Sequence, residues 1–244
     1  MADRTTSPEA PAPVSWWEDY LDIFFAPSRV FARRRDASFW LPLLILTVMA
    51  ALLVIGLRES YAPALDADLV RGMEAAQQNN PSLTAEQVEQ GIAIQRKVIG
   101  VVSLVIFPIL ALLLGLIVWG ASKLVGATEK LGQAMLIATF ASFPRLVGLL
   151  AGGVQGLFLP PEALNGANRL SLGPSRFLDP DTVSALTVAL ANRFDLTLLW
   201  ITLLLAIGLK VIGNINMNKA LIAAGLVWLI GALPTVGPAL VGGG

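Results

Sequence analysis

Five long apolar runs divide the chain, and polar segments of very different lengths separate them. The runs cover about residues 39–57, 98–122, 131–159, 195–212 and 220–241. A helix needs about 20 apolar residues to cross about 30 Å of hydrocarbon. Backbone groups inside a bilayer must also be hydrogen-bonded within the protein, which favours helices. The pattern therefore predicts an all-α integral membrane protein, a five-helix bundle whose two ends lie on opposite sides of the membrane.

The segment before the first run has a different pattern. Residues 1–14 are rich in proline, alanine and charge, which predicts a disordered tail. Residues 15–37 predict two short amphipathic helices that lie in the membrane interface. Their candidate interface residues are aromatic and basic: Trp16, Trp17, Phe24, Phe25, Arg29, Arg33, Arg34 and Arg35. The alternative is an ordinary amphipathic layer packed on the spans. Residues 38–244 then form the five-span membrane domain.

Local signals predict where several helices begin. Ser15 with Glu18, and Thr84 with Gln87, have the spacing of capping boxes. The helix that begins after Thr84 is expected to run directly into the second span. Asp181 is expected to cap a semi-apolar helix that leads toward the fourth span.

Lysine and arginine near the span ends predict the orientation. With the N-terminus inside, the inner segments hold nine of these residues and the much longer outer segments hold seven. Positive charge is enriched on the cytoplasmic side of membrane proteins. We therefore expect a cytoplasmic N-terminus and an outer C-terminus.

Composition narrows the chemistry. Of 244 residues, 55% are hydrophobic and 14% are charged, whereas soluble domains carry roughly 25% charged residues. The net charge is zero, so no basic field is available for nucleic acid. Cysteine and histidine are absent, and no acidic residue lies within a span core. The usual catalytic motifs are missing as well. We expect no enzymatic activity, no metal and no cofactor.

Arg145, in the stretch SFPRLVG, is the clear exception inside a span. A central arginine costs about 2.5–3.5 kcal/mol on insertion scales, so it is expected to face the bundle or water and to have partners. The predicted polar break consists of Ser142, Pro144 and Arg145, with Asp195 as the nearest carboxylate by topology. Further candidate partners are the Phe140 carbonyl, which Pro144 leaves free, and the Thr139 and Ser103 hydroxyls.

Two interpretations of this break stay open. In the first, it binds an anionic group such as a lipid headgroup or a solute. In the second, the arginine fastens spans together or snorkels at a helix break. Gly152 and Gly156, farther along the same run, form a GxxxG pattern that predicts close helix packing.

Three stretches together resemble the Yip domain family, multi-span membrane proteins that interact with Ypt/Rab GTPases, and in particular its bacterial branch. They are FFAPSRVFARR at 24–34, LTAEQVEQGIAIQ at 83–95, and GATEKLGQAMLIATFASFPRLVG at 126–148. The resemblance implies a cytoplasmic N-terminus, five spans in the bacterial inner membrane and a non-enzymatic role.

Two functions follow as hypotheses. The first is a membrane scaffold, or a module for lipid and protein interaction, related to membrane organisation or trafficking. Its partners would be the lipid bilayer, including anionic lipids, and an unknown protein. The alternative is a small transporter or permease component that uses the break around Arg145 for an anionic solute or lipid headgroup.

Overall fold

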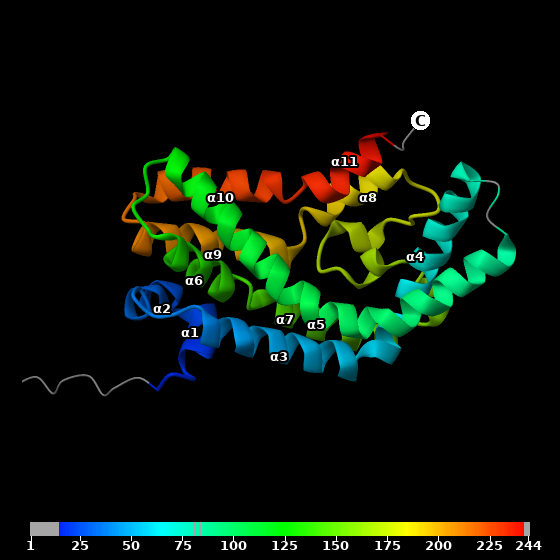
Figure 1. Ribbon diagram of the computed structural model, residues 1–244, viewed down its shortest axis with the longest axis horizontal. Helices are drawn as coiled ribbons and strands as arrows, with labels where there is room; N and C mark the ends of the chain where they lie inside the picture. The colour runs from blue at the N-terminus through cyan, green and yellow to red at the C-terminus, as the bar shows by residue number, and fades with distance from the viewer. Residues whose placement is uncertain (1–14, 81, 83, 242–244) are drawn as a thin grey trace, which may run out of the picture.

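The computed structural model describes residues 15–80, 82 and 84–241, and every regular element in these ranges is a helix (Figure 1). The predicted disordered tail, residues 1–14, lies outside the described residues. The α-helices are α1 (Asp19–Phe25), α2 (Pro27–Arg33), α3 (Trp40–Gly56), α4 (Arg58–Asn79), α5 (Ala85–Leu124), α6 (Leu131–Ala141), α7 (Pro144–Phe158), α8 (Ala185–Asn192), α9 (Leu196–Ile212), α10 (Met217–Ile230) and α11 (Leu233–Val241). Three short 3₁₀ helices, η1 (Pro161–Ala163), η2 (Ala167–Leu170) and η3 (Pro174–Phe177), lie in the loop between α7 and α8.

Three helical segments are long and apolar enough to cross a membrane, namely Val105–Leu124, Leu131–Phe158 and Met217–Gly237. Two bent pairs pass the same test when each is taken as one span. α3 meets α4 at 81°, and α8 meets α9 at 46°. The described residues therefore contain three candidate spans, or up to five when each bent pair is one span.

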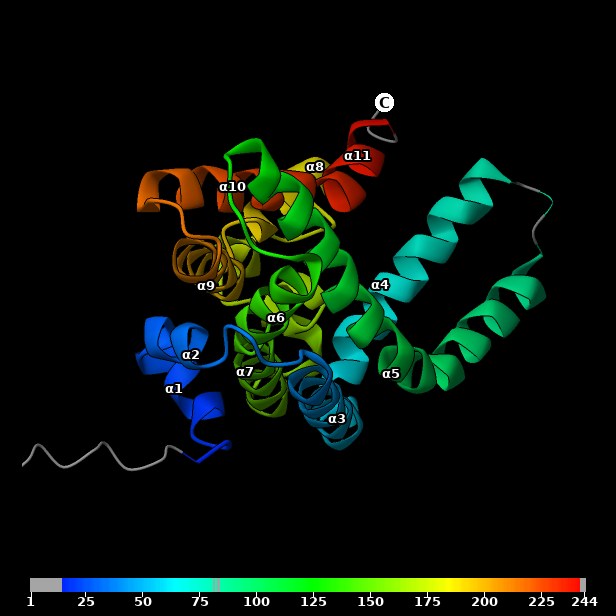
Figure 2. The same cartoon turned by 60° about the vertical axis from the view of Figure 1, so that its left-hand side comes forward.

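Much of the segment after the first apolar run is helical, which the sequence pattern did not predict. α4 continues from α3 after a sharp bend at Leu57 and runs for 22 residues. α5 is a single helix of 40 residues, so the predicted continuation from Thr84 into the second span is confirmed. Figure 2 shows α4 and the first part of α5 leaning away from the other helices as an arm.

The core forms around α6. All positions from Ala134 to Ala141 are buried, because α5 and α9 pack along α6 and α1 and α3 also contact it. Ile23, Val30 and Phe31 of α1 and α2 are fully buried in the same core. Large apolar side chains on the outer faces of α3, α5 and α9 stay exposed, as expected for helices that face hydrocarbon.

The capping predictions have mixed outcomes. Thr84 and Gln87 form the full capping box at the start of α5. Ser15 does not cap α1, because α1 begins at Asp19 and makes no side-chain cap. Asp181 does not cap α8 either. Ser184 accepts the N–H of Thr187 there, and Asp181 instead binds Arg71.

The GxxxG pattern marks a close helix contact, between α7 and α4. The Ser60 carbonyl lies where a side chain on Gly156 would begin, and the Tyr61 hydroxyl lies where one on Gly152 would begin. Any larger residue would push the two helices apart.

We therefore expect Gly156→Leu to lower the thermal unfolding midpoint of the purified protein in detergent, since overpacking costs about 1–3 kcal/mol. The matched control is Gly120→Leu on α5, where a Cβ would meet nothing within 4 Å. Equal midpoints for the two variants would contradict the contact.

Candidate functional site

The third apolar run is broken where the sequence carries Pro144. α6 ends at Ala141 and α7 begins at Pro144, whose missing N–H is tolerated in the first turn of a helix. The Arg145 N–H donates to the Ser142 carbonyl at 3.0 Å, and the Leu146 N–H donates to the Phe143 carbonyl at 2.9 Å. Pro144 therefore starts a new helix, and the backbone groups around it are paired.

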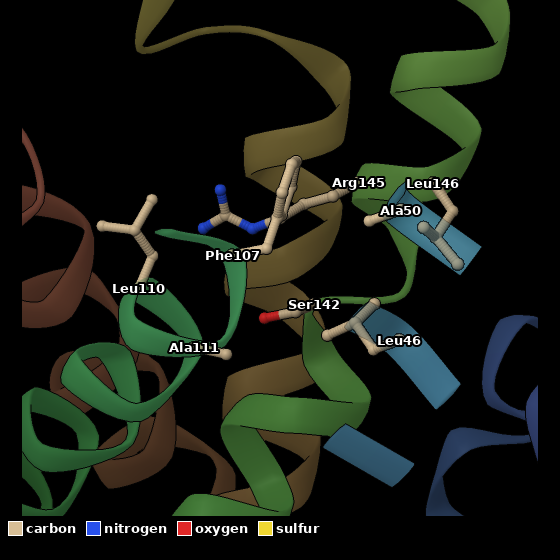
Figure 3. Close-up of a pocket in the computed structure, with 8 residues that line it drawn as sticks. All are labelled: Leu46, Ala50, Phe107, Leu110, Ala111, Ser142, Arg145 and Leu146. Carbon is tan, nitrogen blue, oxygen red and sulfur yellow. The ribbon is translucent and has the colours of Figure 1, made fainter. Parts of the chain in front are cut away.

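The Arg145 side chain crosses from α7 toward α5. Figure 3 shows it extending past Phe107 toward Leu110. A narrow pocket here has mostly apolar walls, formed by Leu46, Ala50, Phe107, Leu110, Ala111 and Leu146, together with Ser142 and Arg145. Among the described side chains, Arg145 donates no hydrogen bond and forms no ion pair. A charge is thus held in an apolar setting, and no described side chain serves as its counter-ion.

The partners expected for Arg145 within its own run form other hydrogen bonds and accept none from its side chain, so these predictions were wrong. The Phe140 carbonyl accepts the N–H of Phe143 at 3.2 Å. The Thr139 hydroxyl donates to the Met135 carbonyl, and the Ser142 hydroxyl donates to the Ala138 carbonyl. Short helical spacing explains this, because a hydroxyl reaches the carbonyl four residues earlier without any tertiary contact. The Ser103 side chain lies outside the described residues.

Asp195 lies on the same cavity as Arg145 but makes no ion pair with it. One carboxylate oxygen accepts the Thr197 N–H at 2.8 Å and so caps α9. The other accepts the Leu172 N–H at 2.7 Å. The carboxylate is thus bound by backbone N–H groups, and it fastens the loop between α7 and α8 (residues 159–184, the outer loop of the predicted topology) to the start of α9.

A cavity of about 390 Å³ opens beside these two residues. It lies between α4, α5, α7, α9 and the outer loop. Its lining residues are Tyr61, Phe107, Arg145, Gly148, Leu149, Ala167, Leu170, Ser171, Leu172, Asn192, Asp195, Thr197, Leu198 and Ile201. The Tyr61 hydroxyl donates to the Leu149 carbonyl at 2.7 Å and holds one wall in place. The cavity therefore combines a guanidinium group with a largely apolar surface.

Arg193 is a second arginine near this cavity, and the sequence reasoning did not single it out. It joins α8 to α9 and donates to the carbonyls of Trp228 and Gly231 at the end of α10. Its guanidinium lies 5.0 Å from the centre of the Trp228 ring. Within the described residues Arg193 has no carboxylate partner. Its positive charge repels the positive charge of Arg145. The signal in the sequence that could have identified Arg193 is its position just before the fourth apolar run.

The outer loop that covers the cavity is held by polar contacts to α4. Asp68 accepts the Ala167 N–H at 2.9 Å. Arg71 bonds both Asp68 and Asp181, at 2.6 Å and 2.9 Å, and also the Asn165 carbonyl. Asp179 accepts the Asp181 N–H, which holds the pKa of its carboxyl below the usual range. The loop thus has a defined conformation over the cavity.

The predicted interface residues divide into two groups. Trp16, Trp17 and Phe25 are 58%, 52% and 86% exposed. Phe24 instead packs edge-on against Trp200, with ring centres 5.2 Å apart. Three of the four predicted aromatic residues thus form an exposed surface, and Phe24 is not part of it.

The arginines of this layer mostly bind the protein itself. Arg33 donates to Asp19 at 2.5 Å and to Asp22 at 2.7 Å, and the hydrogen bond with Asp22 raises the pKa of Arg33. Arg34 also binds Asp19, and Arg35 donates to the Val211 carbonyl. Arg29 is exposed, without an ion pair to any residue that the structure describes.

No group of three or more acidic side chains in the described ranges is placed to hold a metal ion. The long apolar helices, their exposed apolar faces and the broken third run define a helical membrane protein. The sequence model of the Yip1 domain matches residues 21–237, and the chain belongs to this family. The resemblance to the Yip domain family is thereby confirmed.

Membrane protein YknW of Bacillus subtilis is a relative, 29% identical over 205 residues, which cover 83% of this chain and 81% of the relative. No solved structure matches the chain significantly.

Asp195 acts here through its hydrogen bonds. We expect Asp195→Ala to lower the free energy of unfolding by about 1–2 kcal/mol, because a cap and a loop contact are lost together. Asp195→Asn keeps a carbonyl oxygen that can cap α9, so its loss should be smaller. Unfolding in denaturant would measure both. Equal losses for the two variants would show that the negative charge matters more than the cap.

Proposed function

We propose that the chain is a five-span, non-catalytic scaffold of the bacterial inner membrane, and that α1 and α2 attach it to the cytoplasmic lipid surface. Residues 15–37 form the interfacial layer and residues 38–244 the membrane domain. The proposal takes each bent pair of helices as one span. Five crossings would put the two termini on opposite sides of the membrane, and the distribution of lysine and arginine favours a cytoplasmic N-terminus and an outer C-terminus. The link to membrane organisation or trafficking comes from the family resemblance.

The observation that carries this proposal is the two-sided character of α1. Its inner side buries Ile23 in the core and Asp19 against two arginines. Its outer side exposes Trp17, Leu21 and Phe25. Leaving a large apolar side chain in water costs about 1.5–3 kcal/mol compared with burying it. Tryptophan and other aromatic rings are favoured at the level of the lipid headgroups.

The apolar contribution outweighs the electrostatic one in this layer. Arg33 and Arg34 share Asp19, which is almost completely buried, so much of their charge is balanced within the protein. Of the four arginines in this layer, Arg29 and Arg35 are exposed and have no ion pair among the described residues, and Arg35 donates to the Val211 carbonyl. A reversal of Arg33 and Arg34 would therefore break internal ion pairs, whereas Arg29→Glu tests lipid attraction alone.

The absence of native cysteine permits a direct test. A spin label on Phe25→Cys, in vesicles that contain anionic lipid, should show greater contact with oxygen than with a water-soluble nickel relaxant. The control is Asn218→Cys, an exposed position at the start of α10 on the same proposed side. A Phe25 label as accessible to nickel as the Asn218 label would overturn the interfacial position of α1.

The cavity beside Arg145 favours a second function, the passage of an anionic solute or lipid headgroup. It places one guanidinium group inside a span and next to a volume large enough for a ligand. We expect Arg145→Lys to fold but to lower anion flux in reconstituted vesicles, since lysine cannot bind an oxyanion through two parallel N–H groups. Flux equal to that of the wild type would remove this function.

A further inference from the structure

We infer that the cavity beside Arg145 binds a phosphate-bearing amphiphile, with the phosphate on the Arg145 guanidinium and the apolar tail along the neighbouring leucine and aromatic walls. This inference deepens the second of the two functions proposed above. It concerns equilibrium binding and does not require transport.

The first argument is the charge of Arg145. Within the described residues it has no ion pair, and its surroundings include Phe107, Leu110 and Leu146. A charged side chain inside a membrane normally pairs with an opposite charge or with backbone carbonyls. Here Arg145 lines a cavity instead, so an anionic ligand would supply the missing partner.

The second argument is the balance of charge around the cavity. Asp195 is the acidic residue in the lining, and backbone N–H groups from Leu172 and Thr197 already occupy its oxygens. Arg145 is the other charged residue of the lining, and it has no ion pair among the described residues. Because the Asp195 carboxylate is already bound by N–H groups, the unpaired charge at the cavity is positive. That charge favours an anionic ligand, such as the phosphate group of a lipid.

The third argument is the arrangement of donors near Arg145. Gly148 lies three residues after Arg145, on the same face of α7. Because Gly148 has no side chain, the Thr197 hydroxyl approaches to 2.8 Å from where a Cβ would sit. Asn192 lines the same cavity and adds an amide. An arginine with nearby hydroxyl and amide donors suits an oxyanion with several acceptor oxygens.

The fourth argument is the remaining wall, which distinguishes an amphiphile from a free anion. Its apolar members are Phe107, Leu149, Leu170, Leu172, Leu198 and Ile201. The volume of about 390 Å³ lies within the range of about 300–1,000 Å³ for small-molecule sites. A hydrated phosphate ion would leave this apolar wall uncovered, whereas an acyl chain would bury it.

The test is equilibrium binding to the full-length protein in detergent, by calorimetry, with three probes. Dioctanoyl phosphatidic acid carries both parts of the ligand, dioctanoylglycerol carries the tail alone, and inorganic phosphate carries the anion alone. We expect the phosphatidic acid to bind most tightly and dioctanoylglycerol to bind at least tenfold more weakly. Phosphate that binds as tightly as the amphiphile would overturn the role of the tail. Failure of both phosphate probes to bind would overturn the site.

Three variants assign the site to residues. Arg145→Gln should weaken phosphatidic acid binding about tenfold to a hundredfold, the effect of losing a charge-assisted hydrogen bond. Leu198→Trp should fill the apolar end and weaken the same probe while Arg145 stays in place. Arg58→Gln, which removes an exposed arginine paired with Glu59, should leave binding unchanged. Unchanged binding in Leu198→Trp would overturn the inference even if Arg145→Gln failed to fold.

These results are separable from the outcome for transport. Phosphatidic acid binding that depends on Arg145 without measurable flux would remove the second proposed function and leave this inference standing. Flux without such binding would overturn this inference and leave the second proposed function standing.

Discussion

A single constraint organises the centre of the molecule: backbone polar groups inside a bilayer have to be paired within the protein. Pro144 lacks the N–H that would continue α6, so the chain ends one helix at Ala141 and begins another at Pro144. Hydrogen bonds from Arg145 and Leu146 to Ser142 and Phe143 pair the groups across the junction. Because α6 is buried along almost all of its length, this junction fixes where α7 leaves the core and where Arg145 lies.

From that position the arginine reaches the edge of a cavity that several distant segments complete. α4 contributes Tyr61, α9 contributes Leu198 and Ile201, and the outer loop contributes residues 170–172. Asp68 and Arg71 hold the loop to α4, and Asp195 holds it to α9. These acidic side chains thus hold the backbone of the loop in place. No described carboxylate lies within ion-pair distance of Arg145.

An acidic side chain also organises the layer formed by α1 and α2, at the other end of the bundle. Asp19 is nearly inaccessible and binds two arginines, which allows a charged helix to pack closely on α6 and α9. Breaking a buried ion pair is costly because one charge is then left unpaired. The same arrangement leaves the tryptophans and Phe25 on the outer side, so the surface of this layer is more aromatic than basic.

The sequence by itself determined the helical class, the approximate positions of the apolar runs, the start of α5 at Thr84 and the break at Pro144. These features depend on local composition, on spacing and on the missing N–H of proline, and all of them can be read without knowing which segments touch. It also determined that Arg145 is the charged residue that stands out inside a span, because charged residues are rare in apolar runs.

Only the tertiary structure decided how the polar groups pair. The expected partners of Arg145 bind carbonyls within their own helix, Asp195 caps α9, and Arg33 and Arg34 bind Asp19. A hydroxyl reaches the carbonyl four residues earlier in its own helix without any tertiary contact, and neither hydroxyl is bonded to Arg145. The hydrogen bonds from Arg193 to the Trp228 and Gly231 carbonyls join segments far apart in the chain. Periodicity describes one helix at a time, and therefore it carries no information about such contacts.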